Sequence, residues 1–425
     1  MMLIVLRLML FFVVFTMTTV RAMAGSGAYR LEVPDAGSAG KGSAFVGEAN
    51  TPAAVYWNPA GMTQIVGQAV STGACLVQPR ASFESASGDQ SQMKPGNFGI
   101  PHMYYVYGAQ SFALGVGMMS NWGLTTEWLP NGFARYYSTK TVMQNKDYLL
   151  AGALKVNDQL SLALGLDIDD SSLDQQKKFD QSGVGGTDGN VRLKGTDTAY
   201  GFRVAGMFRL NEQNQFGLMY RSQIRHKYEG KVHIDGMHPI VRGAYDFDPT
   251  TGSYETPITY KSTLPDSIVF GYSFKPDDKW TFNADLEWMN WSVVEHQYVD
   301  YSSESNAQRR AFLEQGNSAS SKDWKSVFSF SLGTEYKMAD NFRLRGGYYH
   351  HESPIPSVTW GPVLPDADSN GFATGFGYDI TKNLTFDFAW SALLYDDRKI
   401  DNSYAPAGTY KQWISMTYAT TTYKF

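Results

Sequence analysis

The stretch Ala53-Ala54-Val55-Tyr56-Trp57-Asn58-Pro59-Ala60-Gly61-Met62 decides how the rest of the chain is interpreted. It ends a segment, residues 25–66, that is rich in glycine and alanine and shows no sustained helical or strand period. So few bulky apolar side chains leave little buried area to offset the entropy of ordering the backbone. We therefore expect this segment to be a plug, packed inside a wall that residues 67–425 provide.

Within this stretch, Asn58 to Gly61 predicts a turn where the plug meets the wall. Pro59 fixes its own φ and disfavours a helical conformation at Asn58, whose side chain can bond nearby backbone. Gly61 can take a positive φ, because glycine has no Cβ. An ordinary Asn-Pro turn with no further role also explains these four residues.

The first 24 residues predict a cleaved export signal. Arg7 supplies positive charge, residues 8–20 are apolar, and Ala22-Met23-Ala24 is a cleavage site of the A-x-A type. The apolar run is shorter than the roughly 20 residues that a transmembrane helix needs, which disfavours an anchor. We expect the mature chain to begin at Gly25, and we find no later stretch that is long and apolar enough for a spanning helix.

Composition narrows the class of protein. The chain has 36 Lys and Arg against 41 Asp and Glu, and removal of the signal takes two arginines and leaves a net charge of −7. An acidic exported chain has no electrostatic reason to bind nucleic acid. With Cys75 as its one cysteine it cannot form an intrachain disulfide. An exported chain without a spanning helix is either soluble or a membrane β-barrel.

About fourteen strand-like segments follow from Gln68 onward. In residues 160–169, 280–288 and 384–394, apolar side chains alternate with small, polar or charged ones. This is the period of an outer-membrane barrel strand, with one face toward lipid and the other toward the lumen. A soluble β-sandwich also alternates, so the period alone leaves both folds open.

The connections between these segments favour the barrel. Short turns at 109–110, 157–158, 211–213, 276–278, 339–341 and 381–383 alternate strictly with longer links at about 87–97, 129–135, 178–192, 236–255, 301–323, 355–369 and 401–408. Such alternation places every short turn at one rim, whereas a Greek-key sandwich would break it at its crossovers. The chain also ends on an aromatic residue, Phe425. We predict an all-β transmembrane antiparallel up-and-down barrel in the bacterial outer membrane, with the N-terminal plug, or hatch, in its lumen.

At three places the chain resembles the FadL/TodX family of outer-membrane transporters for long-chain fatty acids and other hydrophobic compounds. Asn58-Pro59-Ala60 matches the N-P-A signature of that family. Ser120-Asn121-Trp122-Gly123-Leu124-Thr125-Thr126-Glu127 resembles the strand that carries an inward kink, and Ser353-Pro354-Ile355-Pro356 resembles the end of a late strand. In this order, after a signal peptide and on this strand count, the motifs are jointly specific.

The resemblance implies a passive channel. A hydrophobic ligand would be captured among the outer loops, pass to an inner pocket, and leave sideways beside the kinked strand after the hatch moves. An alkyl chain gains about 0.8 kcal/mol per buried CH₂, so an aqueous exit would oppose transfer. The resemblance makes Asn58, Pro59, Ala60 and Gly61 the gate of the hatch, and Ser120, Asn121, Trp122 and Gly123 the lateral opening. Gly123 would form a bulge or bend, the alternative being an ordinary small residue in a strand.

Among hydrophobic ligands, the resemblance favours a long-chain fatty acid. Its carboxylate needs a cationic or donor partner on leaving water. The resemblance places Lys325 at a basic ligand-contacting position, although a solvated lysine at a loop edge is the alternative. A second basic position appears here as Asp169 to Ser172, which leaves room for neutral aromatic or aliphatic hydrocarbons. An outer capture surface, or simple packing of the loop 236–255 against its neighbour, would explain Met237, Ile240, Val241, Tyr245 and Phe247.

No catalytic or metal-binding motif stands out, and we expect no cofactor. Residues 366–371 match half of a calcium loop, but Gly377 stands where the loop needs an acid. The adjacent His350 and His351 would face opposite sides of a strand. We expect a non-enzymatic, monomeric channel whose partners are its hydrophobic ligand and outer-membrane lipid. The alternatives are a general porin, a barrel-embedded lipid hydrolase, and a surface adhesin or receptor.

Overall fold

The computed structural model describes residues 27–31, 34–297, 299–315 and 320–425, and the predicted signal peptide, residues 1–24, lies outside them. The strands of the barrel wall are β1 (Gly67–Ser85), β3 (Phe98–Gly108), β4 (Phe112–Met119), β5 (Gly123–Glu127), β6 (Lys140–Lys155), β7 (Leu160–Phe179), β8 (Gly189–Arg209), β9 (Asn214–Arg221), β10 (Ile224–Asp235), β11 (Tyr254–Leu264), β12 (Ser267–Phe274), β13 (Trp280–Met289), β17 (Val327–Ala339), β18 (Phe342–His351), β19 (Ser369–Asp379), β20 (Leu384–Tyr395) and β22 (Ala405–Lys424). Short strands in the loops are β2 (Gln90–Gln92), β14 (His296–Gln297), β15 (Val299–Asp300), β16 (Ser320–Ser321) and β21 (Arg398–Asn402).

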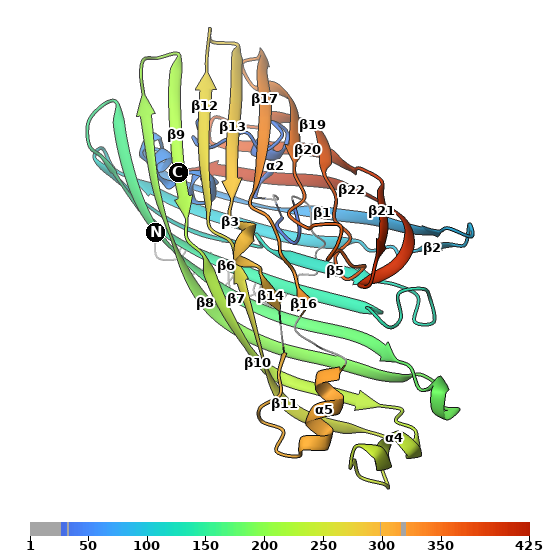
Figure 1. Ribbon diagram of the computed structural model, residues 1–425. Helices are drawn as coiled ribbons and strands as arrows, with labels where there is room; N and C mark the ends of the chain where they lie inside the picture. Colours follow the sequence, from blue (N-terminus) through green and yellow to red (C-terminus); the bar gives the residue numbers. More distant parts are fainter. Residues whose placement is uncertain (1–26, 32–33, 298, 316–319) are drawn as a thin grey trace.

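These segments form the predicted barrel. Three wall strands are interrupted, so that β4 with β5, β9 with β10, and β11 with β12 each form one strand, which gives fourteen. Sequential neighbours pair antiparallel, and β1 closes the sheet on β22 from Ala69↔Lys424 to Ser85↔Gly408. Figure 1 shows the strands of this wall and the labelled β1 and β22. The all-β barrel that the sequence predicts is therefore confirmed.

Among the described residues, helices are few and short. They are α2 (Ala36–Ala39), α3 (Ala54–Trp57), α4 (Pro239–Ala244) and α5 (Ala307–Gln315), with 3-10 helices η1 (Pro59–Gln64), η2 (Ser182–Val184) and η3 (Trp291–Val293). In the described residues, none of the helices has the length and apolar character to cross a membrane.

Side chains on the wall alternate as the sequence predicts. On β13, Trp280, Phe282 and Leu286 point outward and are 37–49% exposed, whereas Asp285 and Glu287 point inward and are 7% exposed. Exposed apolar side chains recur around the wall, for example on β7, β8, β12 and β20. We call this outward-facing apolar band the belt, and it is the lipid-facing surface of a membrane barrel.

The two rims differ in the way that the loop lengths predict. Short turns lie at one rim, and long loops with α4 and α5 lie at the other (Figure 1). The short turns contain Asn or Asp side chains that accept backbone hydrogen bonds two and three residues on, as Asn157, Asn211 and Asp277 do at 2.8–3.0 Å. This local chemistry reverses the chain without further residues. By the asymmetry of outer-membrane barrels, the rim with long loops faces the exterior.

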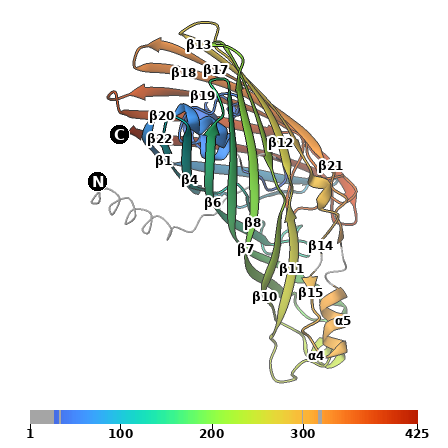
Figure 2. The same ribbon diagram turned by 90° about the vertical axis from the view of Figure 1, so that its left-hand side faces the viewer.

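Residues 34–66 of the N-terminal segment lie inside the barrel (Figure 2). Their backbone touches the backbone of the wall at glycines. A Cβ added to Gly347 on β18 would lie 2.1 Å from the Gly42 nitrogen, and one added to Gly271 on β12 would lie 2.3 Å from the Gly47 nitrogen. The small residues of the plug therefore serve close backbone packing against the wall.

Candidate functional site

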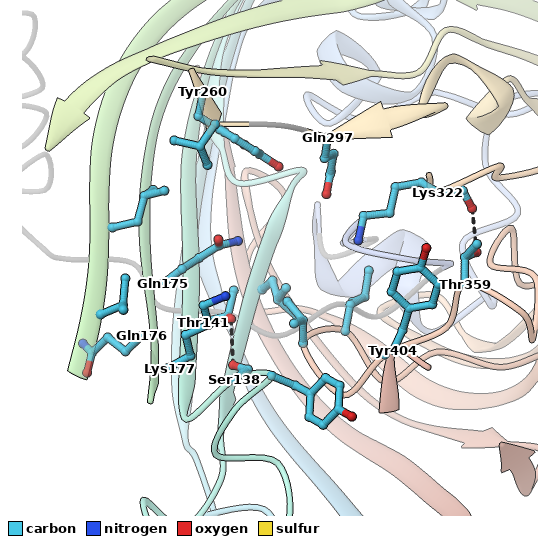
Figure 3. A pocket seen from close by; sticks show the side chains of 18 of the residues that line it. Ser138, Thr141, Gln175, Gln176, Lys177, Tyr260, Gln297, Lys322, Thr359 and Tyr404 are labelled. Atoms are coloured by element: carbon cyan, nitrogen blue, oxygen red, sulfur yellow. Dashed lines mark hydrogen bonds between the residues drawn. The ribbon is translucent and has the colours of Figure 1, made fainter. Parts of the chain in front are cut away.

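A cavity of about 380 Å³ lies within the exterior half of the barrel (Figure 3). Wall strands β5 to β8, β10 and β11 line one side of it. The other side is lined by Gln297, Val299 and Tyr301 and by loops near residues 322–324 and 355–364. We call it the outer cavity. Its apolar lining, which suits a hydrophobic ligand, includes Leu124, Val191, Leu193, Val232, Trp324 and Ile355.

Two lysines bring positive charge to the outer cavity. Lys177, near the end of β7, and Lys322, in the loop before β17, both line it, and Figure 3 shows them reaching in from two sides. The Lys322 N–H donates to the Glu295 carbonyl at 2.7 Å, and its carbonyl accepts from the Thr359 hydroxyl at 2.7 Å, which fixes this part of the loop. Burial lowers the pKa of Lys322, because its ammonium group is poorly solvated. A ligand carboxylate would supply the counter-charge that such a group needs.

Lys325, the headgroup candidate from the sequence, lies three residues further along the same loop. Its side chain is exposed, its N–H donates to the Pro354 carbonyl at 2.9 Å, and it does not line the outer cavity. The structure thus brings Lys322 to the cavity and leaves Lys325 outside. Sequence reasoning missed Lys322 because an irregular loop has no period that tells which of two neighbouring lysines points inward.

Four aromatic side chains pack together beside the outer cavity. Tyr29 packs edge-on against Trp291 at 5.0 Å between ring centroids, and Trp291 packs in the same way against Trp122 at 5.8 Å and Trp324 at 5.3 Å. We call Tyr29, Trp122, Trp291 and Trp324 the aromatic layer. Tyr29 and Trp324 line the outer cavity, whereas Trp122 lines a smaller inner cavity. The layer therefore stands between the two cavities.

The predicted kink coincides with a break in the wall. β4 ends at Met119 and β5 begins at Gly123, so that Ser120, Asn121 and Trp122 lie outside the strand ladder. β3 pairs with β4 from Met103 onward, but within the described residues no strand pairs with its first five residues, Phe98–His102, on that side. The wall is incomplete between β3 and β5.

Residues of the plug and of β6 form hydrogen bonds with the residues at this break. The Leu31 N–H donates to the Asn121 carbonyl at 2.7 Å, and the Gly123 N–H donates to the Tyr29 carbonyl at 2.9 Å. The Tyr56 hydroxyl donates to the Asn121 side chain at 2.5 Å, and the Asn121 N–H donates to the Asp147 carboxylate at 2.7 Å. The N-terminal segment therefore supplies backbone partners that a continuous wall strand would find in its neighbour.

The predicted hatch turn joins the plug to the wall. The Asn58 amide donates to the Val46 carbonyl at 3.0 Å and to the Gly206 carbonyl of β8 at 3.1 Å, and its oxygen accepts from the Ala60 N–H at 3.1 Å. Pro59 begins η1, as the local rules for proline predict. All four residues, Asn58 to Gly61, are buried.

Gly61 differs from the expectation of a positive φ. It lies within η1 and is absent from the residues with positive φ. A Cβ at this position would lie 2.2 Å from the Ala49 carbonyl oxygen. Glycine is needed here for close approach of two plug segments, a tertiary reason that the turn motif does not reveal.

The inner cavity, of about 20 Å³, has a mixed polar and apolar lining that includes two buried arginines. Arg203 pairs with Asp167 at 2.8 Å and donates to the Tyr56 carbonyl at 2.8 Å. The Arg221 guanidinium lies over the Tyr56 ring, 4.3 Å from its centroid. Sequence reasoning missed these residues, because inward positions of distant strands meet only after the barrel closes.

The five capture candidates divide into packed and exposed residues. Met237 and Phe247 are buried, and Phe247 and Tyr245 pack against Phe312 of α5. Val241 is half-buried, whereas Ile240 is 58% exposed. None of the five lines the outer cavity. Packing of the loop against its neighbour thus explains most of its apolar residues, and a role in capture remains a prediction.

Comparisons with known proteins identify the family of this chain. Residues 17–423 match the model of the family described as outer membrane protein transport protein (OMPP1/FadL/TodX). The long-chain fatty acid transport protein of Escherichia coli K12 is 23% identical over 419 residues, which cover 89% of this chain and 91% of that protein.

Solved structures show the same fold. A FadL homologue from Pseudomonas aeruginosa superposes with a TM-score of 0.81 at 18% identity and covers 94% of this chain and 100% of its own. The toluene transporter TodX of P. putida gives a TM-score of 0.72 at 17% identity, with 95% and 99% covered. The chain therefore belongs to the OMPP1/FadL/TodX family of non-enzymatic outer-membrane channels for hydrophobic compounds.

Proposed function

We propose that this channel takes up long-chain fatty acids. The observation that carries the proposal is the outer cavity, in which the ammonium groups of Lys177 and Lys322 meet an apolar lining. A fatty acid combines the two parts that such a site recognises, a carboxylate and an alkyl chain. The similarity to a long-chain fatty acid transport protein supports the same ligand class.

The proposed route runs from the outer loops to the bilayer. Ligand binds in the outer cavity, with Lys322 in place of Lys325 at its headgroup. Movement of the aromatic layer and of the hatch then opens the way to the break between β3 and β5, where the ligand leaves sideways. Support for this exit comes from Tyr29 and Leu31, whose backbone bonds at the break can separate without opening a wall ladder.

Binding of oleate and oleyl alcohol to the purified channel tests the ligand class. Lys322→Met should weaken oleate binding about 10- to 150-fold, because a hydrogen bond to a charged group contributes about 1.5–3 kcal/mol. Oleyl alcohol should bind equally to wild type and variant, because it carries no charge. Lys325→Met is the matched control and should change the binding of neither ligand, since Lys325 lies outside the cavity.

The same experiment separates the neutral-hydrocarbon alternative. Equal loss of oleate and oleyl alcohol in Lys322→Met would show that the lysine shapes the cavity without recognising charge. Uptake of toluene by proteoliposomes that do not take up oleate would favour an aromatic-hydrocarbon channel. A large, steady conductance in planar bilayers would instead indicate a general porin.

A further inference from the structure

A second concave site lies on the exterior part of β10 and β11, and its lining shares Gln297 with the outer cavity. Arg225 and Lys227 on β10 and Lys261 on β11 are exposed, and they alternate with inward-facing, buried Tyr228 and Tyr260. The three cations line a cavity of about 320 Å³ together with His226, His296 and a few neutral residues. No carboxylate is among the described residues that line it. We call Arg225, Lys227 and Lys261 the basic cluster.

The basic cluster contains an unfavourable pair. Lys227 and Lys261 are directly opposite each other in the antiparallel ladder, and Arg225 lies two residues from Lys227 on the same face. Like charges that face each other across two strands destabilise a sheet. An anion bound between these side chains would replace their mutual repulsion with attraction to the anion.

Neighbouring acids offset the cluster only in part. Lys227 pairs with Glu229 at 3.1 Å, but both side chains are more than half exposed, where an ion pair contributes little. Asp300 lies opposite Thr259, near Lys261. Within the described part of the chain, neither Arg225 nor Lys261 forms an ion pair with any carboxylate.

A break in the wall shapes the site. β11 pairs with β15 at Thr259 and Tyr260, and β12 pairs with β13 from Ser267 onward. Between these two ladders, residues 261–266 have no strand partner on that side among the described residues. The segment from Val293 to Gln297 lies across this edge and forms the other wall of the cavity.

The site lies where the belt ends on the exterior side. Tyr200 and Phe202 on β8 and Ile268 and Phe270 on β12 are 43–64% exposed and belong to the belt. The Lys227 N–H donates to the Asp197 carboxylate at 3.0 Å, which places the basic cluster close to Tyr200 along the wall. Polar residues follow on these strands toward the exterior loops. A cation at this level meets the headgroups of the outer leaflet.

We propose that the basic cluster binds the phosphate group of an outer-leaflet lipid. Phosphate carries up to two negative charges and several acceptor oxygens, which matches three converging cations better than a single carboxylate does. Arg225 can bind two phosphate oxygens at once, and Thr263, which is opposite Arg225 in the ladder, lines the same cavity. Because the belt begins beside the site, the acyl chains of the same lipid lie against Tyr200 and Phe202.

Native mass spectrometry of the purified channel with bis-phosphorylated lipid A tests this assignment. The triple variant Arg225→Gln, Lys227→Gln, Lys261→Gln should bind the lipid at least about tenfold more weakly, because each basic residue near an anionic surface contributes about fivefold. Lys231→Gln is the matched control. Lys231 lies on the same face of β10, pairs with Glu255 at 2.6 Å and does not line the cavity, so its loss should leave binding unchanged.

Lipid A freed of both phosphates should bind the wild-type channel as weakly as the phosphorylated form binds the triple variant. Equal binding of the phosphorylated lipid to wild type and triple variant would overturn the proposal, as would equal binding of the dephosphorylated lipid. Displacement of the lipid by inorganic phosphate would assign a free-anion site, and displacement by oleate a carboxylate site. If the triple variant does not assemble, Lys261→Gln alone should weaken binding about fivefold.

Discussion

The contact between Gly42 of the plug and Gly347 of β18 gives a sharp test of how the hatch is held. In Gly347→Ala, the new Cβ would lie 2.1 Å from the Gly42 nitrogen and 2.3 Å from the Lys41 carbonyl carbon. Real Cβ atoms keep at least 3.0 Å from such atoms, so the plug backbone must retreat by about 0.9 Å. No flexible side chain can yield in its place, because both contacts are with backbone.

Overpacking of this kind costs about 1–3 kcal/mol, which corresponds to a 5- to 150-fold shift of the seated plug toward an unseated form. The matched control is Gly346→Ala on the same strand, whose Cβ would lie 3.8 Å from its nearest neighbour, a Thr334 methyl carbon. Both variants gain the same strand propensity. The difference in plug stability between them therefore reports the plug contact alone.

Hydrogen exchange of the purified barrel measures the effect. Amides within residues 34–66 should exchange 5- to 150-fold faster in Gly347→Ala than in Gly346→Ala, while amides of β6 to β8 stay protected in both. Planar-bilayer recordings should show more frequent opening of the same variant. Identical exchange in the two variants would refute the view that close backbone packing holds the plug in place.

Three further predictions follow from the site. Asn58→Ala removes the bonds to Val46 and Gly206 and should destabilise the seated plug by about 1–2 kcal/mol, so that uptake of oleate falls while the barrel still assembles; normal uptake would contradict a gating role. Burial opposes the charged form of Glu48, but the charge of Lys41 at 2.5 Å and a bond from Asn283 outweigh it and hold the pKa of Glu48 below its usual 4.5. Its stabilising contribution is therefore complete above that value and lost as pH falls below it, so plug exchange should accelerate in acid, and Glu48→Gln should remove this dependence. Ile240→Ser should slow association of oleate in stopped-flow binding without changing the melting temperature, since Ile240 is exposed; an unchanged rate would leave α4 with a packing role alone.

Local rules in the sequence predict much of the wall. The alternation in residues 280–288 assigns Trp280 and Phe282 to the lipid face and Asp285 to the lumen, because side chains along a strand alternate whatever the strand pairs with. The strict alternation of short and long connections orders the strands and separates the rims. The break at Ser120–Trp122 also coincides with the motif that resembles a kinked strand.

Which side chains meet inside the lumen depends on how the barrel closes. Lys322, Arg221 and the aromatic layer come from segments far apart in the chain, and their meeting depends on the register of fourteen strands and on loops without any period. Gly61 and Gly347 show the same limit. At each position another backbone segment lies where a Cβ would be, so only glycine fits. Sequence alone predicted a barrel with a lipid-facing surface and an N-terminal plug, because the faces of strands and the turns between them are encoded by neighbouring residues. Only the tertiary structure decided which cation meets the ligand, because that depends on distances between residues that the chain keeps hundreds of positions apart.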